Sequence, residues 1–236
     1  MSAAIQEEEC NQLIEALPRR DRNRILAGCE VVDLVAGDSL CERNQPLTHV
    51  YFPVVGFISL VTTLEGHRPL ELSLIGNEGM LGVTLGLGIM TAPTEAIVQG
   101  AGKALRMGVQ QFMSELRRSR ALQRALNRHA YMLMVQLART AGCTHFHEIE
   151  PRLARWLLVT HDRAQTDHFH LTHQLLADML GVRRSGVTIA AGSLQKKQLV
   201  RYRRGEISVL DRRGLEAASC ECYQALFDDR VKLFRV

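Results

Sequence analysis

The chain has 236 residues, of which 46% are hydrophobic, 23% charged and 5% aromatic. This composition is typical of a soluble globular protein with one large or two smaller cores, and it excludes disordered, collagen-like and purely coiled-coil chains. The uncharged stretch of residues 79–94 contains four glycines and a proline and is too short to cross a bilayer. We expect no membrane contact, and the lack of a basic, apolar leader predicts a cytoplasmic protein.

The charge is unevenly divided along the sequence. Residues 1–150 contain 14 basic and 16 acidic side chains, a net charge of −2, whereas residues 151–236 contain 15 and 9, a net charge of +6. Residues 183–213 alone contain nine basic and two acidic side chains, a net charge of +7. This asymmetry indicates a polyanionic partner. A basic face that is simply solvated, with no partner, would explain the same charges equally well.

The first predicted elements are one or two short helices between residues 5 and 28, interrupted at Pro18. From residue 30 to 107, short apolar runs alternate with glycine, proline and asparagine. Such runs, with a turn about every 8 to 12 residues, predict an antiparallel sandwich or barrel. The expected strands are residues 31–35, 49–53, 57–63, 71–75, 96–99 and 103–107.

A long helix is predicted next, because no glycine or proline occurs between Gly108 and Gly142. At about 1.5 Å per residue it could extend for roughly 50 Å. Its apolar positions cover more than half of the circumference, which favours two partners: the chain's own barrel and the same helix of a second subunit. Burial within one monomer is the alternative. The side chains expected on this dimer helix include Leu122, Leu126, Leu133 and Leu137.

The strongest motif lies at residues 172–190, THQLLADMLGVRRSGVTIA. Two short helices that cross steeply need a small residue at the contact, a glycine between them and an apolar residue that fixes the second helix. Ala177, Gly181 and Val187 meet these requirements. We therefore predict a helix-turn-helix whose first helix is capped by Thr172 and whose second begins near Arg183. The outward side chains expected to read bases are Arg183, Arg184, Ser185 and Thr188.

Residues 199–203 and 206–210 alternate with a period of two around Arg204-Gly205, which predicts a β-hairpin. A basic hairpin beside a helix-turn-helix would lie against phosphates while the helix reads bases. This combination argues against a generic helical hairpin with surface arginines. The side chains expected to contact phosphates are Thr172, Gln174, Lys196, Arg201, Arg203 and Arg204.

From about residue 13 to residue 222 the chain resembles the Crp/Fnr family of bacterial transcription regulators. The resemblance rests on the strand-turn-strand pattern of residues 40–56, the helix that Pro151 opens, and the motif at 172–190 with its basic hairpin. Arg184 occupies the place of a base-contacting arginine, whereas Ser185 and Ile189 replace two other readers. The resemblance implies an α+β fold. Its expected parts are an antiparallel, jelly-roll-like β-roll (1–108), a long dimerisation helix and hinge (109–148), and a winged helix-turn-helix domain (149–236).

The resemblance implies a homodimeric, sequence-specific regulator of transcription that binds double-stranded operator DNA and catalyses no reaction. RNA polymerase is a further implied partner, and an unidentified small-molecule effector is an open alternative to a purely structural barrel. Cyclic-nucleotide binders of the family use a glutamate for the ribose and an arginine for the cyclic phosphate. The corresponding positions here lack both, so a bound cyclic AMP would keep an unneutralised phosphate. The degenerate effector pocket consists of Gly82, Val83, Thr94, Glu95 and Ala96.

Six of the nine histidines lie between positions 145 and 173, and such a concentration is a possible sign of metal binding. Cys143, His145, His147 and Glu148 could bind a metal, but their spacing matches no recognised site, and the six cysteines form no Cys-x-x-Cys pair. The N-terminal cysteine cluster of the family's iron–sulfur members is also missing. We therefore predict no metal and no cofactor. A sensing role for the His145–His173 region or for the Cys220/Cys222 pair stays open.

The competing hypothesis is a metal-dependent jelly-roll enzyme with an appended winged helix. The predicted barrel offers only His49 and His67, without the paired histidines and carboxylate that such a metal site needs. A third alternative, a winged helix used for protein contacts, disagrees with the net charge of +7 at residues 183–213.

Overall fold

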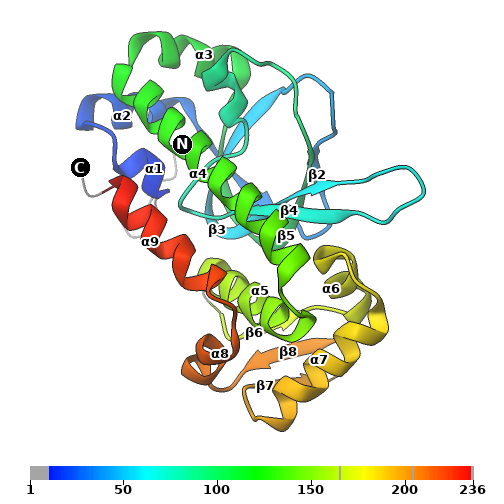
Figure 1. Cartoon of the computed structure of the whole chain (residues 1–236). Coiled ribbons are helices and arrows are strands. Elements are labelled where there is room, and N and C mark those ends of the chain that lie inside the picture. Colours follow the sequence, from blue (N-terminus) through cyan, green and yellow to red (C-terminus); the bar gives the residue numbers. More distant parts are fainter. Residues whose placement is uncertain (1–10, 165, 204, 235–236) are drawn as a thin grey trace. The chain divides into compact units, whose positions relative to one another are not determined.

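The computed structural model describes residues 11–164, 166–203 and 205–234, and these divide into two compact units (Figure 1). The first unit contains residues 11–60 and 74–133, and the second contains residues 61–73 and 134–234. The division therefore falls inside a helix, whereas the sequence predicts a boundary near residues 147–151. The three-part division at residues 108 and 148 stays a prediction. In the described part of the chain, no helix is long and apolar enough to cross a membrane.

Five strands form the main sheet, in the order β1-β5-β3-β4, and β2 also pairs with β5. Both β1 and β2 run antiparallel to β5. Glu30 lies opposite Arg106 in this register, and the two side chains form an ion pair at 2.7 Å. The strands are β1 Glu30–Leu34, β2 Ser39–Cys41, β3 His49–Thr62, β4 Leu70–Ile75 and β5 Glu95–Gly108.

The structure corrects two strand predictions. The predicted strands 49–53 and 57–63 form the single strand β3, and 96–99 and 103–107 form the single strand β5; each is continuous over 14 residues. The glycines inside them are points of close backbone approach and not turns. A Cβ atom at Gly56 would lie 2.4 Å from the carbonyl oxygen of Gly100, and one at Gly102 would lie 2.1 Å from that of Val55. Only glycine permits such contact between neighbouring strands.

Two short helices precede the sheet, α1 Gln12–Glu15 and α2 Arg19–Gly28, and Pro18 separates them as predicted. Asn11 caps α1, since its side-chain oxygen accepts hydrogen bonds from the backbone N–H groups of Leu13 and Ile14. Its amide nitrogen donates to the carbonyl groups of Pro53, at 2.9 Å, and Gly79, at 2.8 Å. This fully buried side chain therefore fixes the helix to β3 and to the loop that follows β4.

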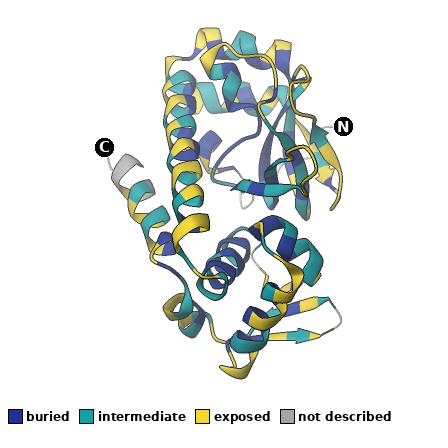
Figure 2. Cartoon of the chain, turned by 45° about the vertical axis from the view of Figure 1, so that its right-hand side comes forward, coloured by how far each residue is buried: buried dark blue, intermediate teal, exposed yellow. Residues whose placement is uncertain are grey.

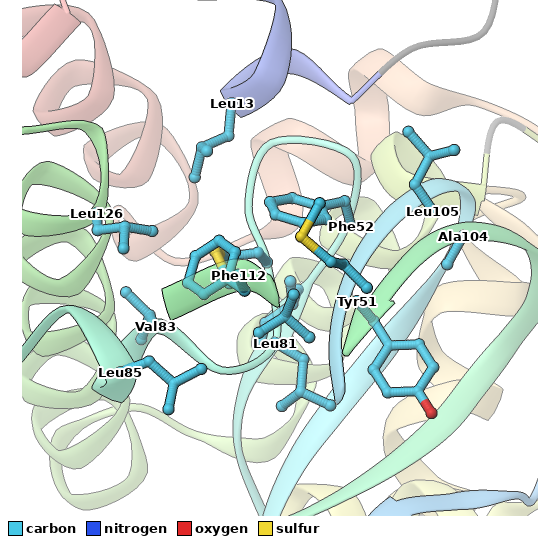
Figure 3. Close-up of a cluster of buried hydrophobic side chains, with 14 of the residues drawn as sticks. Leu13, Tyr51, Phe52, Leu81, Val83, Leu85, Ala104, Leu105, Phe112 and Leu126 are labelled. Atoms are coloured by element: carbon cyan, nitrogen blue, oxygen red, sulfur yellow. The ribbon is translucent and has the colours of Figure 1, made fainter. Parts of the chain in front are cut away.

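The core of the first unit lies between the sheet and the helices that follow it (Figure 3). Phe52 of β3 and Phe112 of the next helix are fully buried, with ring centroids 6.2 Å apart. A 3₁₀ helix, η1 Val83–Leu87, adds Val83 and Leu85 to the same cluster.

The predicted helix from residue 109 is two helices, α3 Val109–Arg118 and α4 Arg120–Phe146. Ser119 interrupts them with an extended backbone (φ −122°, ψ 104°). Its hydroxyl oxygen accepts from the backbone N–H of Leu122 at 3.0 Å and donates to Asp21 at 2.7 Å. The break therefore depends on a serine cap and a distant carboxylate, so no glycine or proline signals it.

Three of the four leucines predicted on the dimer helix, Leu122, Leu126 and Leu133, are buried in the core of their own unit. Leu137 remains 40% exposed. The exposed side of α4, visible in Figure 2, carries other apolar residues, including Tyr131 and Met134. Leu122, Leu126 and Leu133 are therefore occupied by their own unit and Leu137 is not, and a dimer contact of this helix stays a prediction.

The second unit is built on α5 Ile149–Ala164, the largely buried helix whose first turn contains Pro151. Its Trp156 indole donates a hydrogen bond to Glu71 at 2.7 Å, which attaches the start of β4 to this unit. A three-stranded sheet has the order β6-β8-β7. The sequence predicted β7 and β8 as a hairpin but did not predict β6. The remaining elements are β6 His168–His170, α6 His173–Leu180, α7 Arg184–Lys196, β7 Val200–Arg203, β8 Glu206–Val209, α8 Arg212–Ala218 and α9 Cys222–Phe234.

Candidate nucleic-acid interface

The turn between α6 and α7 determines how these helices cross. Thr172 caps α6 by accepting a hydrogen bond from the N–H of Leu175 at 3.1 Å, and Gly181 ends the helix in the left-handed conformation (φ 64°, ψ 40°). The N–H of Val182 then bonds to the carbonyl oxygen of Ala177 at 2.9 Å, which closes the helix end. Ala177 and Val187 are buried, as the predicted crossing requires.

The first turns of α7 present a continuous exposed surface. Arg183 is the N-cap residue, and Arg184, Ser185 and Thr188 are exposed beside it. Ile189, 74% exposed, lies on the same surface. It adds an apolar side chain to a helix face that is otherwise polar, and in the sequence Ile189 stands out only as the replacement of a charged reader.

A histidine connects the two helices to the β-hairpin. The His173 ring stacks on Tyr202 of β7 with a centroid distance of 4.1 Å and an interplanar angle of 19°. The Thr188 hydroxyl donates to the carbonyl oxygen of Arg184, so His173 Nδ1, 3.0 Å from that hydroxyl, acts as the donor. Burial, and then the charge of Arg184, lower the His173 pKa, so the ring is neutral at neutral pH. No pattern in the sequence signals this contact.

The hairpin of β7 and β8 has the predicted form, with Gly205 at φ 84°. Arg201 and Arg203 are exposed on β7, and Lys196 is exposed at the end of α7. Tyr202 donates its backbone N–H to the Gln195 side chain at 2.8 Å, which holds the hairpin against α7. The predicted phosphate contact Arg204 lies outside the described residues.

Two other predicted phosphate contacts have structural partners. The hydroxyl of Thr172 serves as the α6 cap. The Gln174 amide donates to Asp178 at 2.8 Å, and Asp178 also forms an ion pair with Arg68 at 3.3 Å. These contacts orient α6, the first helix of the motif. Lys196, Arg201 and Arg203 are therefore the stronger candidates for phosphate binding.

The predicted effector positions form no cationic pocket. Gly82 adopts φ 101°, and Val83 points into the apolar cluster shown in Figure 3. Ala96 is fully buried, whereas Thr94 and Glu95 are half-buried. No basic side chain stands at any of these five positions.

The histidines of residues 145–173 do not converge on one site. His161 pairs with Asp167 at 2.6 Å, His170 with Glu206 at 2.7 Å, and His145 packs edge-on against Phe146. Among the described residues, the single group of side chains with metal-binding geometry is Cys143, His147, Cys220 and Cys222. It includes neither His49 nor His67, so nothing favours the alternative of a jelly-roll enzyme with a metal in its barrel.

Comparison with known proteins agrees with this geometry. Residues 151–218 match the family model of the Crp-like helix-turn-helix domain. The chain has the Crp/Fnr fold. A Crp/Fnr-family regulator from Eubacterium rectale superposes with a TM-score of 0.67 at 16% identity, covering 90% of this chain and 97% of its own. FixK2 from Bradyrhizobium japonicum gives 0.68 at 14% identity, with coverage of 81% and 98%.

A Crp/Fnr-family regulator from Thermus thermophilus gives a TM-score of 0.65 at 21% identity, covering 83% of this chain and 98% of its own. No curated protein matches the sequence. The predicted fold class, with an antiparallel N-terminal β-roll, a long helix and a C-terminal helix-turn-helix region, is confirmed.

The turn glycine allows a direct test of the motif. Gly181→Ala should destabilise the second unit by about 1–2 kcal/mol, because an alanine there must adopt the left-handed conformation. Its Cβ atom would also lie 2.8 Å from Leu70 Cδ1. The matched control is Gly192→Ala inside α7, where an added Cβ meets nothing within 4 Å, and we expect a gain of about 0.5–1 kcal/mol. Urea unfolding followed by the fluorescence of Trp156, the chain's one tryptophan, measures both. Equal effects of the two substitutions would contradict the assigned turn.

Proposed function

We propose that the protein is a transcription regulator that binds operator DNA as a homodimer and inserts α7 into the major groove. The observation that carries this proposal is the exposed surface of Arg184, Ser185, Thr188 and Ile189 at the start of α7, beside a basic hairpin. A major groove about 12 Å wide admits one helix, and the N-terminal residues of a recognition helix contact base edges. Catalysis is no part of the proposal.

Each side chain on this surface has a chemical counterpart in the groove. The guanidinium of Arg184 matches guanine O6 and N7, and Arg183 extends the same positive edge. Ser185 and Thr188 offer hydroxyl groups for shorter-range contacts. Ile189 suits a thymine methyl group, which is the apolar feature of the major groove. We therefore expect an operator that combines a guanine with a thymine in each half-site.

Phosphate binding is assigned to Lys196, Arg201 and Arg203, which are exposed and make no ion pair among the described residues. The neighbouring Lys197, by contrast, pairs with Glu150 at 2.5 Å. Phosphate contacts fix the position of the protein on the duplex and give affinity that depends on salt. The proposed wing thus supplies the sequence-independent part of binding.

The dimer contact is assigned to the exposed apolar stripe of α4. Tyr131, Met134 and Leu137 are 51%, 61% and 40% exposed, and Ala138 and Ala141 continue the stripe at three- and four-residue steps. This spacing is typical of a helix that packs against a second helix. A second copy of the chain is the occupant that a two-fold operator requires.

The first unit is proposed to bind no cyclic AMP, and any ligand it has should lack a phosphate. Support comes from the apolar surroundings of Val83 and from the half-buried carboxylate of Glu95. The proposal also includes a contact with RNA polymerase.

A cytoplasmic location is proposed as well. None of the five described cysteines forms a disulfide, which suits a reducing compartment.

Base reading and phosphate binding should separate in two variants. Arg184→Ala should cost about 1–3 kcal/mol per half-site and relax the preference at one base pair. Arg203→Ala should weaken binding to all sequences alike and lower the slope of log K against log salt by about one unit for each phosphate that the variant no longer neutralises. Competition binding at several salt concentrations, against a selected operator and its single-base variants, measures both. If Arg203→Ala changes the base preference and Arg184→Ala does not, the two roles are reversed.

The α4 stripe should control the oligomeric state. Leu137→Asp places a charge in the proposed contact, so sedimentation should give about 26.5 kDa in place of about twice that mass. The control Leu64→Asp changes a leucine that is 63% exposed outside the stripe, and it should stay dimeric. A wild-type monomer at micromolar concentration, with or without DNA, would refute the proposed dimer.

Cyclic AMP should produce no binding heat in calorimetry up to millimolar concentration, because no cation at positions 82–83 or 94–96 neutralises its phosphate. Micromolar affinity would show that the first unit holds the nucleotide by other residues.

A further inference from the structure

Four side chains from two distant parts of the sequence converge in the second unit. Cys143 lies in the last turn of α4 and His147 follows one turn later, while Cys220 and Cys222 lie where α8 ends and α9 begins. Their ligand atoms all lie within 4.8 Å of one another. Cys143 Sγ is 3.7 Å from Cys220 Sγ, and Cys222 Sγ is 3.7 Å from His147 Nδ1.

We propose that Cys143, His147, Cys220 and Cys222 bind one structural zinc ion. Zinc in a Cys₃His site is tetrahedral, with Zn–S bonds of about 2.3 Å and a Zn–N bond of about 2.0 Å. These bond lengths place neighbouring ligand atoms about 3.5–3.8 Å apart. The two observed separations of 3.7 Å agree with this range.

The second layer around the cluster supports the same conclusion. His147 directs Nδ1 to the sulfur atoms and Nε2 to the Glu221 carboxylate at 3.0 Å. Histidines that bind zinc commonly donate their second ring nitrogen to a carboxylate, which fixes the tautomer and the ring orientation. Glu221 is therefore a positioning residue and not a ligand.

The three thiols are shielded from solvent, and one cation lies beside them. Cys143, Cys220 and Cys222 are all buried. Arg155 lies close enough to Cys143 for its positive charge to act on the sulfur atom. Three thiolates with Zn²⁺ leave one negative charge, which Arg155 offsets. The cost of burying the cluster is thus reduced.

A zinc ion explains the cluster better than the other chemistries of these residues. A disulfide between Cys143 and Cys220 would give Cys222 and His147 no role. Donor atoms within 4.8 Å of one another leave space for a single ion and not for a multi-iron cluster. All four positions are filled by protein, as in structural zinc sites, whereas catalytic sites keep one position open. The ion would fasten the end of α4 to the start of α9.

Metal analysis of the untagged, full-length protein, purified under reducing conditions, tests the proposal. We expect about one zinc ion per chain. Replacement by Co²⁺ should give the visible absorption of tetrahedral thiolate coordination. Absence of zinc after incubation with Zn²⁺ in a reducing buffer would overturn the proposal, as would another metal in octahedral coordination. Peptide mapping that shows a Cys143–Cys220 disulfide in freshly purified protein would also overturn it.

Variants identify the ligands and their orientation. Cys222→Ser should abolish stoichiometric zinc binding, whereas Cys41→Ser, in the first unit, should leave it unchanged. Glu221→Ala should weaken zinc affinity by roughly 10- to 100-fold, and Glu148→Ala, an exposed carboxylate beside His147, should have no effect. The stoichiometry of the wild-type chain decides the proposal even if Cys222→Ser fails to fold. Full zinc binding by a folded Cys222→Ser would exclude the assigned ligand set.

Discussion

The close approach of α6 and α7 at Gly181 is the constraint on which the functional surface depends. Only a left-handed residue at this position lets the chain leave α6, bond Val182 back to Ala177 and enter α7 within two residues. The crossing buries Val187 and thereby turns Arg184 and Thr188 outward. His173 then connects this surface to the hairpin through its stack on Tyr202. One turn, at Gly181, thus positions the end of α6, the exposed surface of α7 and the β7–β8 hairpin.

The sequence predicts best those features that depend on neighbouring residues. The helix-turn-helix, its Thr172 cap and the hairpin around Gly205 all follow from spacings of a few residues, and the structure has each of them. The break at Ser119 depends on Asp21, 98 positions away, and no local pattern signals it. The glycines at 56 and 102 resemble turn residues in the sequence, because close contact between strands cannot be seen in one strand alone.

The same reasoning explains two features of the candidate sites that the sequence does not reveal. The leucines of α4 have the spacing of a contact face, but sequence periodicity does not say which partner that face meets, and the barrel itself covers Leu122 and Leu126. The cysteine and histidine cluster joins residues 73 positions apart or more, so spacing along the chain does not suggest a metal site. Cys143 and His147 are recognisable as metal-competent in the sequence, whereas their partners near Cys220 become visible only after folding.

Charge and geometry together assign the work of the second unit. The basic excess of residues 183–213 is divided between a helix surface suited to bases and a hairpin suited to phosphates. The proposed zinc ion would join the end of α4 to the start of α9 in the same unit. In these proposals, specificity, affinity and rigidity would be carried by different side chains.

Selection of bound duplexes from a random DNA pool tests the central claim, that two copies of α7 read DNA in adjacent major grooves. The account predicts a two-fold symmetric sequence whose half-site centres lie about 34 Å apart, which is one helical turn. Enrichment of no sequence, or of a single asymmetric half-site bound by one chain, would contradict it.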